Sequence, residues 1–345
     1  MLRHHVNLKS YHSFKFDVTA QNFYDIKNYQ TRKELCLQDI LRNKTYILWA
    51  GSNTIFHSSH TQTTIIHPSI YGIQIIQSWD TGDLIQVWAS EDWTNFVIWT
   101  LDHGYHGLEN LIDIPSSVGA TPIQNIWAYG AEVKNYIHSV IFWDRHGVQQ
   151  ILSAEDCHFS YRDSIFKHDL YQQGMIASVI FDLPYYQAHS YHPQIWYQDI
   201  TTYLQKHDID STALTPSHVA NIVSKIRSSK LPDRHHIGTA WSFFKNPIID
   251  QDQYKSLCQL HPDLDIKAYN IDDQYTKLSA GQLIELCGYK GYHTGHVWVY
   301  QKHALVLIHD GKGHCEELIN LVTHIQHNVY TKFHINLEPE VCIVP

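Results

Sequence analysis

The stretch from Ile114 to Glu132 joins small residues to hydroxyl and amide side chains that could contact a ligand. It is interrupted by four turn-forming residues, Pro115, Gly119, Pro122 and Gly130. This pattern predicts tight turns rather than one long helix or strand. Small residues let a flat or phosphorylated ligand approach the main chain, and turn amides favour phosphate. An ordinary loop crossing the surface would have the same composition.

A second polar turn, Gly51-Ser52-Asn53, follows the short apolar run 46–48. The run predicts a strand that ends in a glycine turn. Exposed amides and two polar side chains in such a turn suit a pyrophosphate without any lysine.

An arginine lies between two aromatic residues, since Arg162 is flanked by Tyr161 and Phe166. Packing could hold its guanidinium while the planar fork grips a carboxylate through two hydrogen bonds. An ion pair of Arg162 with Asp163 or Glu155 would explain the same residues, so both interpretations stay open.

Two further polar side chains stand out in the second half of the chain. Ser242 precedes the sequence FFKNP, where Phe243 and Phe244 can anchor a turn and so fix the hydroxyl. A lone serine is more often a solvated hydroxyl. Glu340 is the second glutamate of LEPEV at the end of the chain.

The elements that must position these groups follow from apolar spacing and capping residues. Helices are predicted over 33–41, 92–101, 215–231, 278–287 and 316–329, the fourth opening with a capping box of Ser279 and Gln282. Strands are predicted over 46–48, 84–91 and 304–308, and over 133–151 around a turn at 145–147. The segment 184–208 is rich in Tyr, His and Gln and predicts an exposed excursion rather than packed structure.

Composition limits the possible partners. The chain has 345 residues, 25 Lys and Arg, 34 Asp and Glu, and a formal charge of −9. This length predicts two or three domains. An acidic balance disfavours nucleic acid and anionic membranes, and no long uncharged apolar run occurs. We therefore expect a monomeric cytoplasmic protein that binds neither nucleic acid nor membrane.

The chain carries 27 His and six Cys. No C-x-x-C pair or H-E-x-x-H helix is present, and the local histidine groupings lack the partners of a tetrahedral site. We expect free thiols and no metal.

Taken in order, these motifs resemble those of the UDP-N-acetylenolpyruvoylglucosamine reductase (MurB) family. The resemblance covers nearly the whole chain and rests on GSN (51–53), PIQNI (122–126), YRDSIFK (161–167), SFFKNP (242–247) and LEPEV (337–341). It implies an α+β flavin fold of the FAD-binding PCMH/vanillyl-alcohol-oxidase type, with two FAD-binding subdomains and a C-terminal α+β substrate domain. The implied bounds are 1–80, 81–231, 232–332 and a tail, 333–345, that returns to the active site. The segment 184–208 resembles the loop of one branch, in which a tyrosine closes over substrate.

The resemblance implies that NADPH reduces bound FAD and that flavin hydride then reaches the enolpyruvyl ether of UDP-N-acetylglucosamine. The product would be UDP-N-acetylmuramate, a peptidoglycan precursor. Hydride addition to the β-carbon of an unsaturated carboxylate moves negative charge toward the carboxylate, so a cation and a proton donor are needed there. Arg162 and a protonated Glu340 would meet that need, and Ser242 would protonate the α-carbon as general acid.

The same resemblance implies the binding residues. Those for FAD are Gly51, Ser52, Asn53, Ser117, Gly119, Ala120, Thr121, Ile123, Gln124, Asn125 and Gly130. Those for the UDP-sugar are Tyr129, Tyr161, Tyr197, Lys230 and Asn246.

Several positions where the family pattern has glycine carry larger residues here. They are Trp49, Trp88, Ser90, Ser116, Trp127, Trp241 and His296. Glycine permits positive φ and close cofactor approach, which an indole permits only if the loop moves. The alternative interpretation is a flavin-free homologue, or an engineered variant, that keeps the scaffold and at most binds a UDP-sugar.

Overall fold

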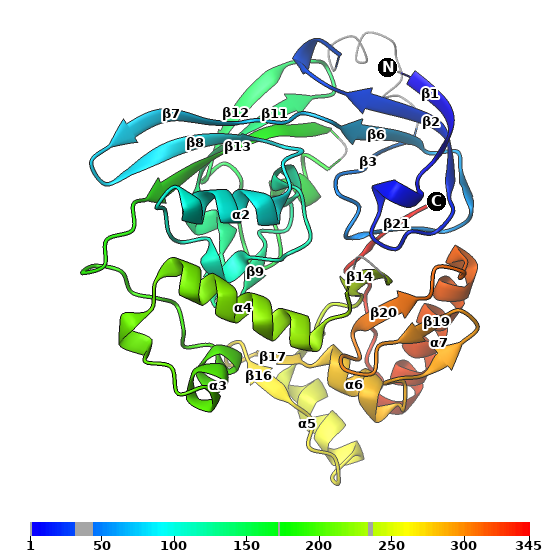
Figure 1. Cartoon of the computed structure of the whole chain (residues 1–345). Coiled ribbons are helices and arrows are strands. Elements are labelled where there is room, and N and C mark those ends of the chain that lie inside the picture. Colours follow the sequence, from blue (N-terminus) through cyan, green and yellow to red (C-terminus); the bar gives the residue numbers. More distant parts are fainter. Residues whose placement is uncertain (1, 32–43, 172, 234–236) are drawn as a thin grey trace. The chain divides into compact units, whose positions relative to one another are not determined.

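The computed structural model describes residues 2–31, 44–171, 173–233 and 237–345. The chain forms two units (Figure 1). The first unit comprises Met1–Val6, Gln21–Ala50 and Thr63–Ser229, and the second comprises Asn7–Ala20, Gly51–Gln62 and Lys230–Pro345. The helix predicted over 33–41 lies outside the described residues.

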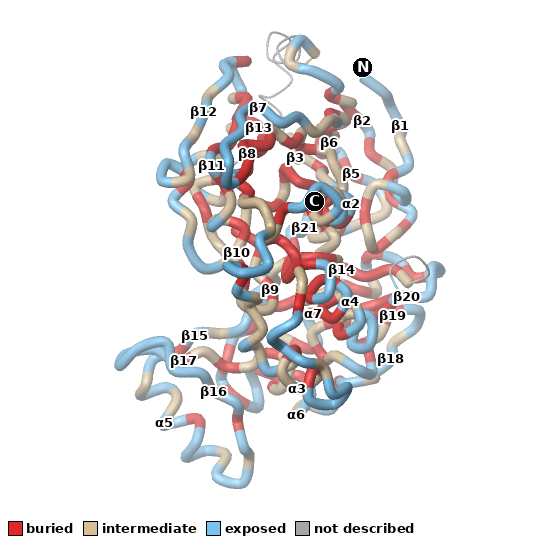
Figure 2. Tube along the Cα trace, turned by 60° about the vertical axis from the view of Figure 1, so that its left-hand side comes forward, coloured by how far each residue is buried: buried red, intermediate tan, exposed pale blue. Residues whose placement is uncertain are grey.

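An antiparallel sheet with the order β12-β11-β13-β8-β7 forms the centre of the first unit. Its strands are β7 (Ile73–Trp79), β8 (Gly82–Trp88), β11 (Ile137–Asp144), β12 (Gln149–Ser153) and β13 (Gly174–Pro184). Figure 2 shows the inner strands buried and the two edge strands, β7 and β12, largely exposed. The predicted strands over 84–91 and 133–151 are confirmed as β8 and the β11–β12 hairpin.

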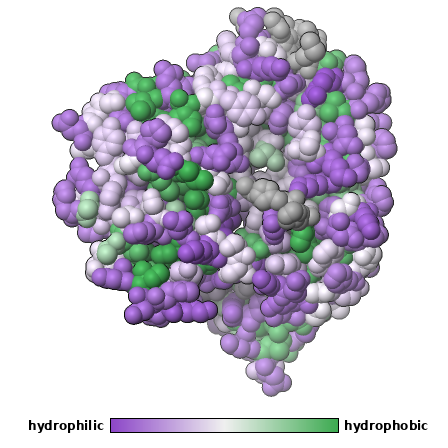
Figure 3. Space-filling view, viewed as in Figure 1, coloured by the Kyte–Doolittle hydropathy of each residue, from purple (hydrophilic) through white to green (hydrophobic). Residues whose placement is uncertain are grey.

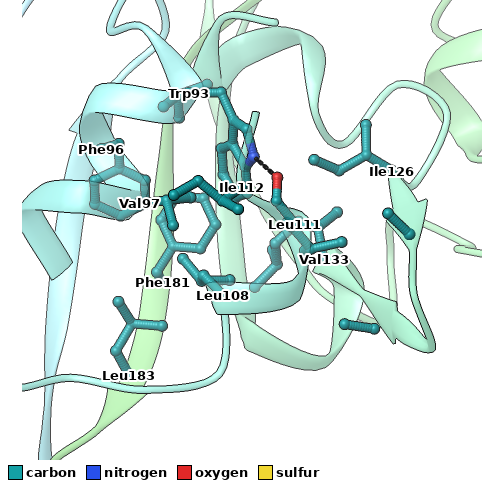
Figure 4. Close-up of a cluster of buried hydrophobic side chains, with 14 of the residues drawn as sticks. Trp93, Phe96, Val97, Leu108, Leu111, Ile112, Ile126, Val133, Phe181 and Leu183 are labelled. Atoms are coloured by element: carbon teal, nitrogen blue, oxygen red, sulfur yellow. Dashed lines mark hydrogen bonds between the residues drawn. The ribbon is translucent and has the colours of Figure 1, made fainter. Parts of the chain in front are cut away.

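Helix α2 (Trp93–Asp102) packs its apolar stripe against this sheet. The side chain of Asp92 caps it by accepting a hydrogen bond from the amide of Asn95 at 2.9 Å. Trp93 is fully buried, and its indole donates to the carbonyl of Leu111 at 2.8 Å (Figure 4). That bond satisfies the one polar group of a buried indole, so the core tolerates it. The helix predicted over 92–101 is confirmed.

The strand β6 (Thr64–Pro68) pairs in parallel with β2 (Thr19–Ile26) on one side and with β3 (Thr45–Ile47) on the other. The strand β1 (Leu2–Asn7) completes this sheet beside β2. The predicted run 46–48 is thus confirmed as a strand, β3.

Two helices follow the central sheet, α3 (Gln198–Lys206) and α4 (Pro216–Lys230). The helix α4 begins after Thr215, whose Oγ1 accepts a hydrogen bond from the amide of His218 at 3.3 Å, as predicted. The prediction that 184–208 is unpacked is wrong, because α3 buries Ile200 and Leu204 in the main core. Ile200 and Leu204 are the buried apolar residues of this helix, and two positions one helical turn apart are too weak a sequence pattern to stand out.

The second unit contains a sheet of order β14-β20-β19-β18 and a smaller one of order β15-β17-β16. Their strands are β14 (Gly238–Ser242), β15 (Ile248–Asp250), β16 (Ala268–Asn270), β17 (Tyr275–Leu278), β18 (His293–Thr294), β19 (Val297–Val299) and β20 (Val306–His309). Three helices accompany them, α5 (Gln251–Leu260), α6 (Ala280–Leu286) and α7 (Cys315–Phe333). The predicted helices over 278–287 and 316–329 are confirmed.

Only one of the two hydrogen bonds of the capping box predicted for α6 is formed. Ser279 accepts from the amide of Gln282 at 3.3 Å. The Gln282 side chain instead accepts from the amide of Lys267 and donates to the carbonyl of Asp265, both at 2.6 Å. Because the neighbouring loop offers both a donor and an acceptor, the glutamine fixes that loop rather than returning to Ser279.

The chain terminus pairs with an early segment of the second unit. The strand β21 (Cys342–Val344) lies parallel to β4 (Thr54–Phe56). In the same unit, β5 (His60–Thr61) pairs with the first two residues of β2. The end of the chain therefore lies directly beside the segment that follows Gly51.

The exposed apolar residues of the first unit include Ile75 and Ile76 in β7 and Ile98 in α2. Figure 3 shows green patches over these two elements. No helix among the described residues is both long and apolar enough to span a bilayer.

Candidate cofactor and substrate site

The Gly51-Ser52-Asn53 turn belongs to the second unit and is held by its neighbours. Gly51 has φ +62°, and a Cβ there would lie 2.6 Å from Cα of His12, so only glycine fits. Asn53 donates from Nδ2 to the carbonyl of Glu340 at 3.1 Å, and its own carbonyl accepts from the amide of Cys342 at 2.9 Å. The turn is thereby fixed to the end of the chain.

His12, which supports this turn, is almost fully buried. Its Nε2 lies 3.2 Å from the carbonyl of Phe16, and Nδ1 has no hydrogen-bond partner among the described residues. Desolvation lowers the pKa of His12 to about 4, and the nearby His309 contributes in the same direction. The ring is therefore neutral near pH 7.

The loop Ser117–Asn125 belongs to the first unit, and its main chain is largely committed to the fold. The main-chain amides of four consecutive residues, Val118, Gly119, Ala120 and Thr121, each donate a hydrogen bond to a protein carbonyl. A ligand here would meet side chains and the small-residue surface rather than these amides. The Ser117 hydroxyl is buried without a hydrogen-bond partner among the described residues.

Asn125 has a positional role. It adopts φ +42°, and its Nδ2 donates to Glu132 at 2.8 Å and to the carbonyl of Ser160 at 3.0 Å. Its Oδ1 accepts from the amide of Lys134 at 3.1 Å. The side chain therefore ties the loop to the turn that carries Arg162.

Arg162 sits in that turn with φ +56°, between Ser160 and Asp163, which form a bridge. The carbonyl of Arg162 accepts from Nζ of Lys167 at 2.8 Å. Asp163 contacts His168 at 2.7 Å. The Ser164 hydroxyl donates to the carbonyl of Ile123 at 2.6 Å, a second link to the loop. The structure thus brings the predicted cation Arg162 next to the predicted cofactor loop.

Tyr129 and Gly130 form a two-residue hairpin turn between β9 (Trp127–Ala128) and β10 (Ala131–Glu132). Their φ values, +49° and +90°, are those of a type I′ turn. The ring of Tyr197 lies edge-on to the rings of Tyr129 and Trp127, with 5.4 Å and 5.9 Å between the ring centroids. Two of the predicted substrate tyrosines therefore lie together.

Burial raises the pKa of Tyr129 to about 12, while the positive charge of Arg227 opposes this rise and the charge of Asp199 adds to it. Arg227 was not singled out from the sequence. It lies in α4 and donates to the carbonyl of Asp113 at 3.1 Å. The available signal was its position one helical turn before Lys230.

In the second unit, the residue after Ser242 pairs with Glu340 through the main chain. The residues after Ser242 run antiparallel to the end of the chain, since the amide of Glu340 donates to the carbonyl of Phe243 at 2.8 Å and Phe244 bridges Pro339. Trp241, just before Ser242, adopts φ +63°, a conformation that favours glycine. Asn246 accepts from the amide of Ala280 at 3.0 Å and so caps α6.

Helix α4 ends at Lys230, and Lys230 and Lys290 both influence His303. His303 has its pKa lowered by burial and then by the positive charges of Lys230 and Lys290. Both lysines therefore lie near the same half-buried ring, an environment that an anion would stabilise.

A cavity of about 590 Å³ lies beside α3 and α4. It is lined by Tyr203, Ile209, Asp210, Ala213, Leu214, His218, Asn221, Ile222 and Lys225. None of the predicted site residues is among them. In the described part of the chain, no three His, Cys, Asp or Glu side chains cluster as metal ligands.

Two protein families match the sequence. Residues 35–153 match the FAD binding domain family, and residues 232–344 match the C-terminal domain of UDP-N-acetylenolpyruvoylglucosamine reductase. A reductase of that name from Aliivibrio fischeri is 35% identical over 97% of this chain and 92% of its own length. The chain belongs to the MurB family. The Burkholderia multivorans MurB is 40% identical over 86% of this chain and 84% of its own length.

A crystal structure of the Thermus caldophilus MurB covers the whole of both chains with a TM-score of 0.67 at 20% identity. This likeness shows that the fold is that of MurB, as the sequence predicts. The FAD-binding match contains the Gly51 turn and the loop Ser117–Asn125, and the C-terminal match contains Ser242 and Glu340. Arg162, Tyr197 and Lys230 lie between the two matches.

The FAD-binding part of this MurB homologue fits its cofactor on one condition. The unpartnered Ser117 hydroxyl and the small residues Gly119 and Ala89 offer a polar group beside a flat surface. The indole of Trp49 now covers Gly119, because a Cβ on that glycine would lie 2.6 Å from Cζ3 of Trp49. The indole has to turn away before a ligand can reach this surface.

Proposed function

We propose that this protein reduces the enolpyruvyl ether of UDP-N-acetylglucosamine to UDP-N-acetylmuramate, with NADPH as electron donor through FAD. The observation that supports the proposal is the bond from the Glu340 amide to the Phe243 carbonyl, which pairs the main chain of Glu340 with the residue after Ser242 in a MurB homologue. Bound FAD would supply hydride to the β-carbon of the substrate.

Two parts of the chain would hold FAD. They are the Gly51-Ser52-Asn53 turn and the residues Ser117, Gly119, Ala120, Thr121, Ile123, Gln124, Asn125 and Gly130. Asn125 would act by fixing the loop, since its side chain is bonded to Glu132, Ser160 and Lys134. Ser117 would contact the cofactor directly, because its buried hydroxyl has no protein partner in the described chain.

Arg162 would grip the substrate carboxylate. Its turn is tied to the loop at Ser160 and Ser164, so the main chain that carries the cation is fixed. Glu340 would add a hydrogen bond to the carboxylate in its protonated form. Both contacts strengthen as charge develops, and they therefore lower the barrier rather than only binding the substrate.

Ser242 would give the α-carbon its proton. Phe243 and Phe244 are both buried, and they would fix the main chain that carries the Ser242 hydroxyl. A positioned general acid contributes about 10²- to 10⁴-fold to such a step.

The diphosphate of the substrate would bind Lys230 and Asn246, with Tyr129, Tyr161 and Tyr197 around the nucleotide. The lysine charge that already disfavours a proton on His303 would be neutralised by the ligand. We further propose a cytoplasmic monomer of three domains, in the branch of the family that carries the extra tyrosine loop.

A flavin-free homologue is the second candidate, favoured by the indole of Trp49 on Gly119. In that case the aromatic side chain replaces the cofactor as part of the core. Purified protein that is colourless and takes up no FAD would support it, whereas a yellow protein would exclude it.

The test of the main proposal is product analysis. The purified protein with FAD, NADPH and the enolpyruvyl substrate should yield a UDP-sugar heavier by two hydrogens, in amounts that match NADPH consumed. NADPH oxidation without that product would overturn the assigned substrate.

A further inference from the structure

Two neighbouring buried residues, Glu109 and Asn110, are not used by the proposed chemistry. They lie in the short 3-10 helix η3 (Glu109–Leu111) and are 4% and 2% exposed. Buried carboxylates and amides are costly unless their hydrogen-bonding groups are satisfied. Their partners therefore show what the structure gains from them.

Glu109 binds the segment that precedes α3. Its Oε1 accepts from the hydroxyl of Tyr191 at 2.8 Å, while Oε2 accepts from the amide of Gly107. Burial, together with the Glu109 charge, raises the pKa of Tyr191, so the phenol remains a donor. The ring of Tyr191 is also contacted edge-on by His106 and Tyr186.

Asn110 joins two segments with one amide group. Its Nδ2 donates to the carbonyl of Tyr129 at 2.8 Å and to the carbonyl of Gln194 at 2.7 Å. The first carbonyl belongs to the hairpin turn of the predicted substrate site, and the second lies three residues before Tyr197. Both amide hydrogens are therefore used to hold these segments side by side.

Ring packing continues the same contact. Trp196 covers Gly130, where a Cβ would lie 2.8 Å from Cζ2 of the indole. Tyr197 then meets Tyr129 edge-on. The segment 191–197 is thus fixed at three successive points: a carboxylate–phenol bond, an amide–carbonyl bond and an indole over a glycine.

We propose that Glu109 and Asn110 are positioning residues that hold the segment 191–197 in the position in which Tyr197 lies against Tyr129. This inference rests on the proposed function, in which both tyrosines contact the UDP-sugar. If the segment is released, only a fraction of molecules has Tyr197 in place, and the apparent substrate affinity falls by that fraction.

The test uses Tyr191→Phe, which removes only the hydroxyl that binds Glu109. The KM for the enolpyruvyl substrate should rise by roughly 10- to 100-fold, the effect of one hydrogen bond to a charged group. Reduction of FAD by NADPH should keep its rate at a temperature where the variant is folded, while the melting temperature falls because buried Glu109 loses one partner. Tyr186→Phe is the matched control and should leave KM unchanged, because that ring packs against Tyr191 but its phenol does not bind Glu109.

A second variant gives an independent reading. Glu109→Gln should also raise KM, and the double variant with Tyr191→Phe should be less than additive, because both remove the same bond. A KM within twofold of the parent in both variants would overturn the proposal. An equal fall in both half-reactions would also overturn it, because it would indicate a general structural role.

Amide hydrogen exchange separates this inference from the proposed function. In Tyr191→Phe, the peptide 187–197 should exchange faster than in the parent and in Tyr186→Phe. If the parent reduces no enolpyruvyl substrate, the proposed function fails while the exchange comparison still reports on the segment. Unchanged exchange in Tyr191→Phe would overturn the role of Glu109.

Discussion

The six-membered ring of Trp49 lies against the main chain of Gly119. A methyl group placed on that glycine would come within 2.6 Å of both Cζ3 of Trp49 and Cβ of Ala89. The small-residue surface of the predicted cofactor loop is therefore already in contact with an aromatic ring from the same unit.

If that ring limits cofactor access, Trp49→Gly should lower the dissociation constant for FAD by about tenfold or more, which corresponds to about 1.4 kcal/mol. Trp127→Gly is the control, because the indole of Trp127 packs against Tyr197, with 5.9 Å between the ring centroids, rather than against Gly119. Combining both changes should add little to the first. Equilibrium titration with FAD measures this, and unchanged affinity in Trp49→Gly would mean that the indole is ordinary packing.

The predicted proton donor gives a sharper separation of steps. Ser242→Ala should leave reduction of FAD by NADPH at the parent rate, since no substrate carbon is protonated in that half-reaction. Oxidation of the reduced flavin by the enolpyruvyl substrate should slow by about 10²- to 10⁴-fold. Rapid mixing measures the rate of each half-reaction separately. A parent-like second half-reaction would remove Ser242 from the mechanism.

Lys230→Ala should raise the KM for the UDP-sugar more than it lowers kcat, because a compact charge on the diphosphate contributes mainly to binding. Lys225→Ala, an exposed lysine of the same helix, is the matched control. Steady-state kinetics provide the comparison. Should kcat fall as much as KM rises, Lys230 would have to act in the chemical step.

Buried His12 predicts a dependence of stability on pH. Its folded pKa, about 4, lies below the usual 6.5, so the unfolded chain binds the proton more readily. The stability contributed by the neutral ring is present above pH 6.5 and is lost as pH falls toward 4, by roughly 3 kcal/mol in total. Urea unfolding at several pH values should show this loss. His12→Gln should flatten the curve over that range, and an unaltered slope would exclude His12 as the cause.

Local structure was the part most accessible from the sequence. Asp92 and Thr215 mark helix starts through side-chain caps, and Gly51 marks a turn that requires positive φ. These are short-range effects that a few residues determine. The motif order also indicated the family, which the comparisons confirm.

What the sequence did not reveal depends on distant partners. Residues 7–20 join the second unit, although the residues on both sides belong to the first. Gln282 turns to Lys267 and Asp265 instead of closing its capping box, because the competing bonds come from a loop. Glu109 has its partner, Tyr191, 82 residues away. Nothing in local spacing predicts such pairs.

The most direct test of the central claim is the visible absorption of the purified protein, followed anaerobically through two additions. The account predicts a flavin spectrum, present on purification or after incubation with FAD, that NADPH bleaches. The enolpyruvyl ether of UDP-N-acetylglucosamine should then restore it while UDP-N-acetylmuramate appears. A protein that takes up no flavin, or a reduced flavin that this substrate fails to reoxidise, would contradict it.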